Sequence, residues 1–182
     1  LGFRVKDDII DWTTDSTDHF EIQNDFVTMA TGMDEDLFEL EETIDMEDGG
    51  TYTIVLPAGK QVYLDVTSSV SSIEITTPDY TRTYDTYNDH LYDAIDNATV
   101  TCTFKENQSG PVTAEVWTCD QELYQQVHDE LAKSQLQITK FEDGKFEGTV
   151  EAAEDGVLML SLPYDEGWSV KIDGEDDDYY MI

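Results

Sequence analysis

The segment Pro163–Trp168 holds side chains whose types and spacing suit sugar binding. Tyr164 and Trp168 each carry a ring that can stack on a sugar face and one polar group that can hydrogen-bond a hydroxyl. The same segment suits a structural plug at the end of a β-sandwich, because its proline ends a strand and its glycine permits a positive φ. We predict Tyr164, Asp165 and Trp168 as ligand-binding residues, with the plug as the alternative.

A tyrosine-rich stretch between residues 79 and 93 is the second candidate. Its aromatic rings can cover the apolar face of a sugar while neighbouring carboxylates accept hydroxyl hydrogen bonds. We predict Tyr84 and Tyr87 as ligand-binding residues of this stretch, with a solvated loop as the alternative. The stretch contains Tyr80, Tyr84, Tyr87 and Tyr92, interleaved with Asp79, Asp85, Asp89 and Asp93.

Carboxylates are abundant, yet their spacing predicts no catalytic residue, no metal site and no cofactor. A calcium site needs about six to eight oxygen ligands, and the acid clusters lack the alternating spacing and closing glutamate of an EF-hand loop. Weak screening by divalent cations is the only metal effect that we expect. Among 42 acids, some pair matches the separation needed by a glycosidase by chance. The clusters are Asp34–Asp36, then Asp45, Glu47 and Asp48, and finally Asp173–Asp178.

Other enzyme motifs are missing from the sequence. It contains no Gly-x-Ser-x-Gly elbow, no His-Glu-x-x-His and no glycine-rich phosphate loop. His19, His90 and His128 stand apart from one another, and we expect them at the surface or as helix caps. An independent hydrolase is therefore the weakest functional hypothesis.

The charge of the chain limits its partners. The 182 residues include 9 Lys and Arg against 42 Asp and Glu, which gives a net charge of -33. Nucleic acid is excluded as a partner because binding to phosphates depends on basic residues, and docking on anionic lipid is disfavoured. The longest aliphatic run, Val157–Leu160, is far shorter than the roughly 20 residues that cross a bilayer. The chain as given spans no membrane, and it opens without Met, so we expect a part of a longer protein.

Two helices are expected among the elements that position these residues. Asp18 is the expected N-cap of a helix from His19 to about Thr31, which Gly32 ends. A second helix is expected over 120–134, because an aspartate N-cap precedes an apolar stripe with the spacing i, i+4, i+8. The stripe consists of Leu123, Val127 and Leu131.

The remaining elements predict a mainly β fold, an antiparallel and jelly-roll-like β-sandwich with one packed helix and a helical N-terminal segment. Short runs rich in Val, Ile, Thr and Tyr, bounded by Gly, Pro and Ser, are typical of such a sandwich. We expect a single domain in which 1–45 form the partly helical segment and 46–182 the sandwich. The step Asp143-Gly144 predicts a hairpin. The predicted strands are Tyr52–Leu56, Val62–Thr67, Ser72–Thr76, Ala98–Phe104, Val112–Trp117, Leu136–Phe141, Lys145–Glu151, Val157–Leu162 and Trp168–Asp173.

Cys102 and Cys119 are the only cysteines, and we expect two buried free thiols, with a disulfide as the alternative. If the two strands that carry them form a hairpin about Asn107–Gly110, Cys102 lies opposite Glu115 and Cys119 opposite Ala98. Such a hairpin does not bring the two sulfurs together.

Three parts of the sequence resemble, in order, the soluble extracytoplasmic region of the YfhO family of bacterial polytopic membrane proteins. The last part is the most specific, because it runs from an apolar strand through Pro-Tyr, a charged pair and Gly-Trp to a strand that ends in Asp-Gly. The first part consists of Leu1–Phe3, Phe20–Asn24, Thr31-Gly32 and Leu37-Phe38; the second of Asp120–Leu131 with Leu136–Ile138; the third of Gly156–Gly174.

The resemblance implies a large protein with many transmembrane helices, similar to membrane glycosyltransferases that use lipid-linked sugars and implicated in the sugar decoration of teichoic acids. The catalytic acid of such enzymes is expected near the first membrane helices, outside this sequence. A non-catalytic domain on the extracytoplasmic side of the cell membrane is therefore expected. Its implied partners are the membrane-embedded remainder of the same protein and a glycan or teichoic acid. A stand-alone carbohydrate-binding module of a secreted protein is the alternative.

Overall fold

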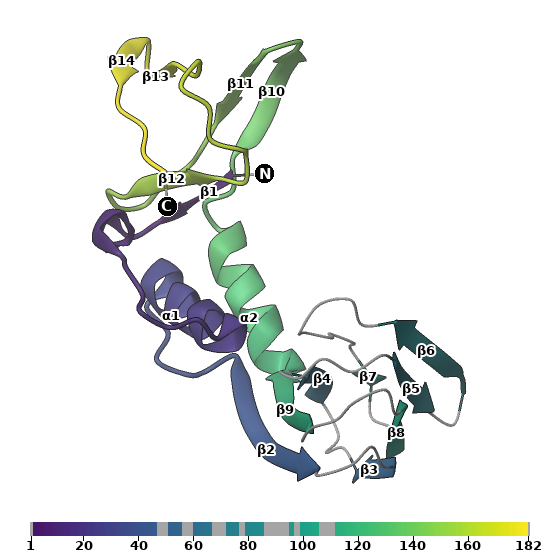
Figure 1. Ribbon diagram of the computed structural model, residues 1–182. Coiled ribbons are helices and arrows are strands. Elements are labelled where there is room, and N and C mark those ends of the chain that lie inside the picture. The colour runs from purple at the N-terminus through teal and green to yellow at the C-terminus, as the bar shows by residue number, and fades with distance from the viewer. Residues whose placement is uncertain are drawn as a thin grey trace. The chain divides into compact units, whose positions relative to one another are not determined.

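The protein is mainly β, with antiparallel strand pairs and two α-helices (Figure 1). The computed structural model describes residues 2–46, 51–55, 60–66, 72–76, 79–85, 95–96, 99–105 and 112–181. These residues fall into two compact units, one formed by Leu1–Glu35 with Gln126–Ile182 and the other by Asp36–Gln125. The mainly β, antiparallel fold class expected from the sequence is confirmed, whereas the single domain with a boundary at residue 45 stays a prediction.

The unit Asp36–Gln125 contains two four-stranded antiparallel sheets. One has the strand order β2-β9-β4-β7 and the other β3-β8-β5-β6, so the chain repeatedly changes sheets between consecutive strands. This order fits a jelly-roll-like sandwich, and the jelly-roll detail itself stays a prediction. The strands are β2 (Phe38–Met46), β3 (Thr51–Val55), β4 (Lys60–Val66), β5 (Ser72–Thr76), β6 (Thr81–Asp85), β7 (Ile95–Asp96), β8 (Thr99–Lys105) and β9 (Val112–Asp120).

The first of these sheets has an apolar face because alternate residues of its strands point to the same side. In the β4–β9 register, Leu64 lies opposite Val116, and Val62, two residues along on the same face, lies opposite Thr118. Val62 and Leu64 are fully buried, and Ala114 and Val116 are buried beside them. Burial of these side chains stabilises the sheet.

Strand β2 was not predicted from the sequence, where it lies in an acidic stretch. Two of its acids are paired with a lysine of β4: the Lys60 ammonium donates to Glu39 and to Glu41, the latter over 3.3 Å. The hydrogen bond with Glu39, and to a lesser degree that with Glu41, raises the pKa of Lys60. A register shift between Leu40 and Glu42 interrupts the alternation of apolar residues, which hides the strand in the sequence.

The conditional hairpin between the two cysteine-bearing strands is not formed. Strand β8 pairs with β3 and β5, whereas β9 pairs with β2 and β4, so Cys102 lies opposite Tyr52 and Ile75 in the backbone register, and Cys119 opposite Phe38 and Gln61. Partner choice depends on which sheet each strand enters, which strand patterning alone does not reveal. Cys119 is a buried free thiol, and burial raises its pKa to about 11.

The other unit contains three strand pairs, β1–β12, β10–β11 and β13–β14, together with helix α1. Hairpin β10–β11 turns at Asp143-Gly144, as predicted. The turn of β13–β14 has positive φ at both Asp173 and Gly174, as a two-residue type I′ turn requires. The bounds are β1 (Gly2–Val5), the 3-10 helix η1 (Asp7–Asp11), α1 (His19–Thr31), β10 (Gln137–Glu142), β11 (Lys145–Thr149), β12 (Val157–Leu160), β13 (Val170–Ile172) and β14 (Glu175–Asp177).

Helix α1 begins and ends where the sequence predicts. The Asp18 carboxylate accepts hydrogen bonds from the backbone N–H groups of Phe20 and Glu21, which satisfies two donors that lack partners within the helix. Gly32 ends the helix with φ +78°, a left-handed conformation that favours glycine. Near the C-terminal end of α1, Ala30 packs in a small core with Val5 and Ile9.

Helix α2 (Gln121–Ala132) follows β9 without a loop. Asp120 caps it as predicted, because its Oδ1 accepts hydrogen bonds from the N–H groups of Glu122 and Leu123. Val127 is buried, and Leu131 packs against the core of Val5, Ile9 and Ala30. The predicted apolar stripe is therefore the inward face of this helix.

Candidate functional site

The turn between β12 and β13 brings together three of the predicted site residues, Tyr164, Asp165 and Trp168. The Asp165 Oδ1 atom accepts a 2.7 Å hydrogen bond from the Gly167 N–H group, and the Asp165 carbonyl accepts one of 3.1 Å from the Trp168 N–H group. The indole Nε1 of Trp168 donates to the carbonyl of Pro163 over 3.3 Å. The polar groups of the turn are thus bonded largely to one another.

The rings of the turn pack against neighbouring elements. Trp168 meets Phe146 of β11 edge to face, with 6.3 Å between ring centroids. Tyr164 lies 5.9 Å from Tyr179, whose hydroxyl donates to the Asp165 carbonyl over 3.4 Å. Desolvation raises the pKa of Tyr179, and the nearby Tyr164, Asp165 and Glu166 raise it further.

Exposure distinguishes the two predicted rings. Trp168 is half-buried, whereas Tyr164 keeps 51% of its surface exposed. Trp168 packs on Phe146 of its own unit, whereas Tyr164 offers an exposed ring next to Asp165 and Glu166 in the sequence, and the sandwich plug stays an untested alternative. Ligand binding by these residues stays a prediction.

Tyr84 belongs to strand β6, the last strand of its sheet, and not to the solvated loop that was the alternative for this stretch. The Arg82 guanidinium lies over two rings, 5.4 Å from the Tyr80 centroid and 5.8 Å from that of Tyr84. It also donates a 3.1 Å hydrogen bond to the Tyr84 hydroxyl. Tyr84 thus faces a cation of its own strand, a contact worth about 0.5–1 kcal/mol at an exposed site. Tyr87 lies outside the described residues.

Sequence reasoning missed Arg82, although a signal for it exists. Tyr80, Arg82 and Tyr84 alternate with a period of two, which places three side chains on the same side of a strand. The interleaved aspartates are more typical of a loop and obscure this alternation. The alternation would have identified both the strand and the stacked arginine.

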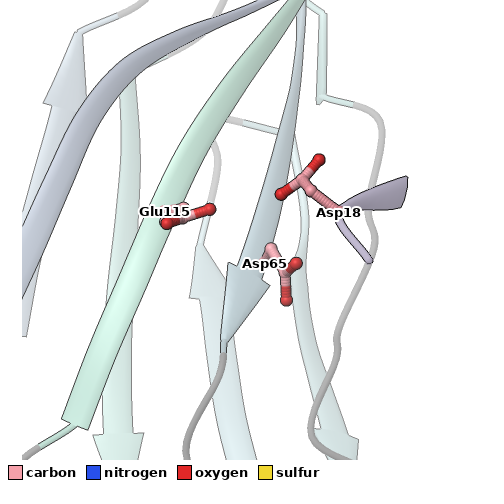
Figure 2. A group of neighbouring side chains, drawn as sticks. All are labelled: Asp18, Asp65 and Glu115. Atoms are coloured by element: carbon pink, nitrogen blue, oxygen red, sulfur yellow. The ribbon is translucent and has the colours of Figure 1, made fainter. Parts of the chain in front are cut away.

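Two carboxylates that sequence reasoning did not single out lie side by side on β4 and β9. Asp65 and Glu115 are directly opposite each other in the strand register, and Figure 2 shows them on these neighbouring strands. Their carboxylate oxygens lie within 4.8 Å of one another, and Asp65 is only 3% exposed. Glu115 accepts a 3.1 Å hydrogen bond from the Trp117 indole. The register that pairs them is not evident from the sequence.

This acid pair alone does not supply a complete set of cation ligands, and the expectation of no metal site stays a prediction. Two carboxylates are far fewer than the about six to eight oxygen ligands of calcium. Asp18, the third residue labelled in Figure 2, belongs to the other unit, where its carboxylate caps α1.

Comparison with known families decides the relationship of the chain. The model of the family described as bacterial membrane protein YfhO matches residues 9–180. The chain belongs to the YfhO family. The match runs through the strand-rich middle of the chain as well as through both ends, where the sequence resemblance was clearest. No curated protein and no solved structure matches the chain.

The acid clusters of this YfhO-family chain lie at the surface wherever they are described. Asp34–Asp36 are exposed, Asp45 accepts a 2.8 Å hydrogen bond from the Thr113 hydroxyl, and Asp176 pairs with Lys171. Glu47 and Asp48 lie outside the described residues. His19 and His128 are exposed on their helices, as expected for surface residues, and His90 is not described. None of the described helices is long and apolar enough to cross a membrane.

Proposed function

We propose that this chain is an extracytoplasmic, non-catalytic domain of a YfhO-like membrane glycosyltransferase that acts in the glycosylation of a cell-wall polymer such as teichoic acid. The observation that carries the proposal is the family match over residues 9–180. The membrane-embedded remainder of the same protein supplies the chemistry. The domain shapes the path of the polymer acceptor or holds the machine together outside the membrane.

The geometry of the Pro163–Trp168 turn supports a role in positioning rather than in acid–base chemistry. A general acid or base must lie within hydrogen-bond reach of the proton that it transfers. In this turn Asp165 Oδ1 and the Asp165 carbonyl are engaged by the Gly167 and Trp168 N–H groups. For the acidic surface we propose weak screening by divalent cations and no bound cofactor.

The side of the membrane is tested by cysteine labelling in intact cells that make the full-length protein. Ser161 is exposed after β12, so the Ser161→Cys variant should react with a membrane-impermeant maleimide. The parent protein is the control, since Cys119 is buried and its raised pKa keeps its thiol protonated. A Cys102→Ser background, used for both proteins, removes the other thiol of this sequence. Labelling that appears only after cell lysis would contradict the extracytoplasmic placement.

A stand-alone carbohydrate-binding module is the second candidate. The exposed ring of Tyr164 favours it, because an open aromatic face beside carboxylates is suited to stacking on a sugar and to accepting its hydroxyl hydrogen bonds. This candidate requires that the chain bind a glycan on its own, without a membrane-embedded part.

A further inference from the structure

The β10–β11 hairpin has one apolar face that is largely exposed. Phe141 lies opposite Phe146, and Ile138 lies opposite Gly148 in the same register. Since residues opposite each other share a face of the sheet, Ile138, Phe141 and Phe146 form what we call the apolar hairpin face. Phe141 is 77% exposed and Ile138 49%. Such exposed large apolar side chains, gathered on one face, mark an interaction surface.

The hairpin is fixed at its base, so this face is presented by a defined element. Phe146 packs edge to face with Trp168, and Leu136, just before β10, is buried. The Leu136 N–H group donates to the Gly2 carbonyl over 2.8 Å, which ties the start of the hairpin to β1. Figure 1 shows β10 and β11 extending away from the β1–β12 pair.

The opposite face of the hairpin is charged but neutralised internally. Lys140 pairs with Glu142 at 3.2 Å, and Lys145 pairs with Glu147 at 2.6 Å. The hairpin Gln137–Thr149 contains Lys140 and Lys145 against Glu142, Asp143 and Glu147, so its net charge of -1 is small in a chain of net charge -33. Charge interactions reach only about 8 Å at physiological salt, so a partner of the hairpin meets a nearly neutral surface.

We propose that the apolar hairpin face docks on the surface of a lipid bilayer with uncharged headgroups, with Phe141 entering the interface. A nearly neutral, amphipathic element complements such a surface, since aromatic rings favour the interface and the charged side chains of the opposite face stay in water. An anionic polymer or a second copy of a chain carrying -33 lacks this complementarity. Because the chain belongs to a membrane protein family, tethering gives a weak contact a high effective concentration.

The test is flotation of the 182-residue chain with pure phosphatidylcholine vesicles at increasing lipid concentration. The unmodified chain should float with the vesicles, and Phe141→Ser should need about tenfold more lipid, because each buried aromatic ring contributes at least that factor. Phe141 is exposed, so its loss should leave the fold intact. Tyr124→Ser on α2 removes another exposed ring, 53% exposed, and should float like the unmodified chain.

Two further measurements test whether the apolar hairpin face contacts the lipid. Brominated phosphatidylcholine should quench fluorescence of Trp168, which contacts Phe146 of the apolar hairpin face. Vesicles with equal parts of phosphatidylglycerol should bind less, because the acidic Asp173–Asp178 hairpin belongs to the same unit. Absence of flotation, or equal flotation of Phe141→Ser, overturns the proposal and leaves a protein or glycan partner for this face. The inference needs no particular side of the membrane, so its failure leaves the cysteine-labelling result standing.

Discussion

Trp168 is the residue whose surroundings best separate a structural from a ligand-binding role. Its ring packs on Phe146 and its Nε1 donates to Pro163 within the turn. Trp168→Ala removes both contacts, and because the ring is half-buried we expect a loss of about 2 kcal/mol, less than for a fully buried ring. In a chain of this size that lowers the melting temperature by roughly 4–8 °C. The melting temperature of Trp168→Phe should lie between those of the parent chain and Trp168→Ala, because phenylalanine keeps a ring and loses the hydrogen bond. Circular dichroism melts measure all three proteins.

Tyr164→Ala is the matched control in the same turn. This ring is 51% exposed, so its loss should change the melting temperature much less than Trp168→Ala does. On a glycan array, lost binding by a folded Tyr164→Ala variant would identify this ring as a sugar contact. A Trp168→Ala variant that melts like the parent chain would refute the structural role of the indole.

At the scale of single elements, the cap of α1 can be tested by itself. Asp18→Ala leaves the N–H groups of Phe20 and Glu21 without their carboxylate partner. Loss of an N-cap costs about 1 kcal/mol, which corresponds to about 2–4 °C in melting temperature. Amide hydrogen exchange in the first turn of α1 should accelerate. Asp18→Asn should restore the cap, and Asp15→Ala removes a nearby exposed charge without touching it. An effect of Asp15→Ala as large as that of Asp18→Ala would assign the change to charge instead.

Elements with local signals could be predicted from the sequence. Helix α1 begins after Asp18 and ends at Gly32, and β10–β11 turns at Asp143-Gly144, because caps and tight turns depend on a few adjacent residues. Strand β2 could not, since its acids are paired with side chains of strands distant in the sequence, such as Lys60 on β4 and Thr113 on β9. Sheet partners also depend on distant segments, which is why the β8–β9 hairpin was not formed.

The candidate site follows the same division. Tyr164, Asp165 and Trp168 could be grouped from the sequence because one turn contains them. The pairing of Asp65 with Glu115 depends on the register of β4 and β9, and the stacking of Arg82 between two tyrosines depends on β6 being a strand. The exposed apolar hairpin face could be found only once burial was known, because the sequence pattern of β10 does not show what covers it.

For the whole molecule, the net charge of -33 opposes compactness, because like charges repel more in the folded state than in an extended chain. The described acid clusters are exposed and only partly paired with lysines. Charge of this kind is screened by salt, with a Debye length of about 10 Å at 0.1 M and 3 Å at 1 M. The melting temperature should therefore rise by several degrees as sodium chloride increases over this range.

The same titration distinguishes screening from a specific cation site. Potassium chloride should act like sodium chloride, because screening depends on ionic strength, and magnesium chloride at matched ionic strength should act nearly alike. Asp65 and Glu115, an acid pair within one unit, supply fewer oxygen ligands than the about six to eight that calcium takes. A rise in melting temperature at micromolar calcium or magnesium would contradict pure screening and require an ordered ion. A melting temperature that stays constant or falls with salt would mean that charge repulsion does not limit the stability of the fold. In that case favourable contacts of the acidic side chains offset the repulsion that the net charge predicts.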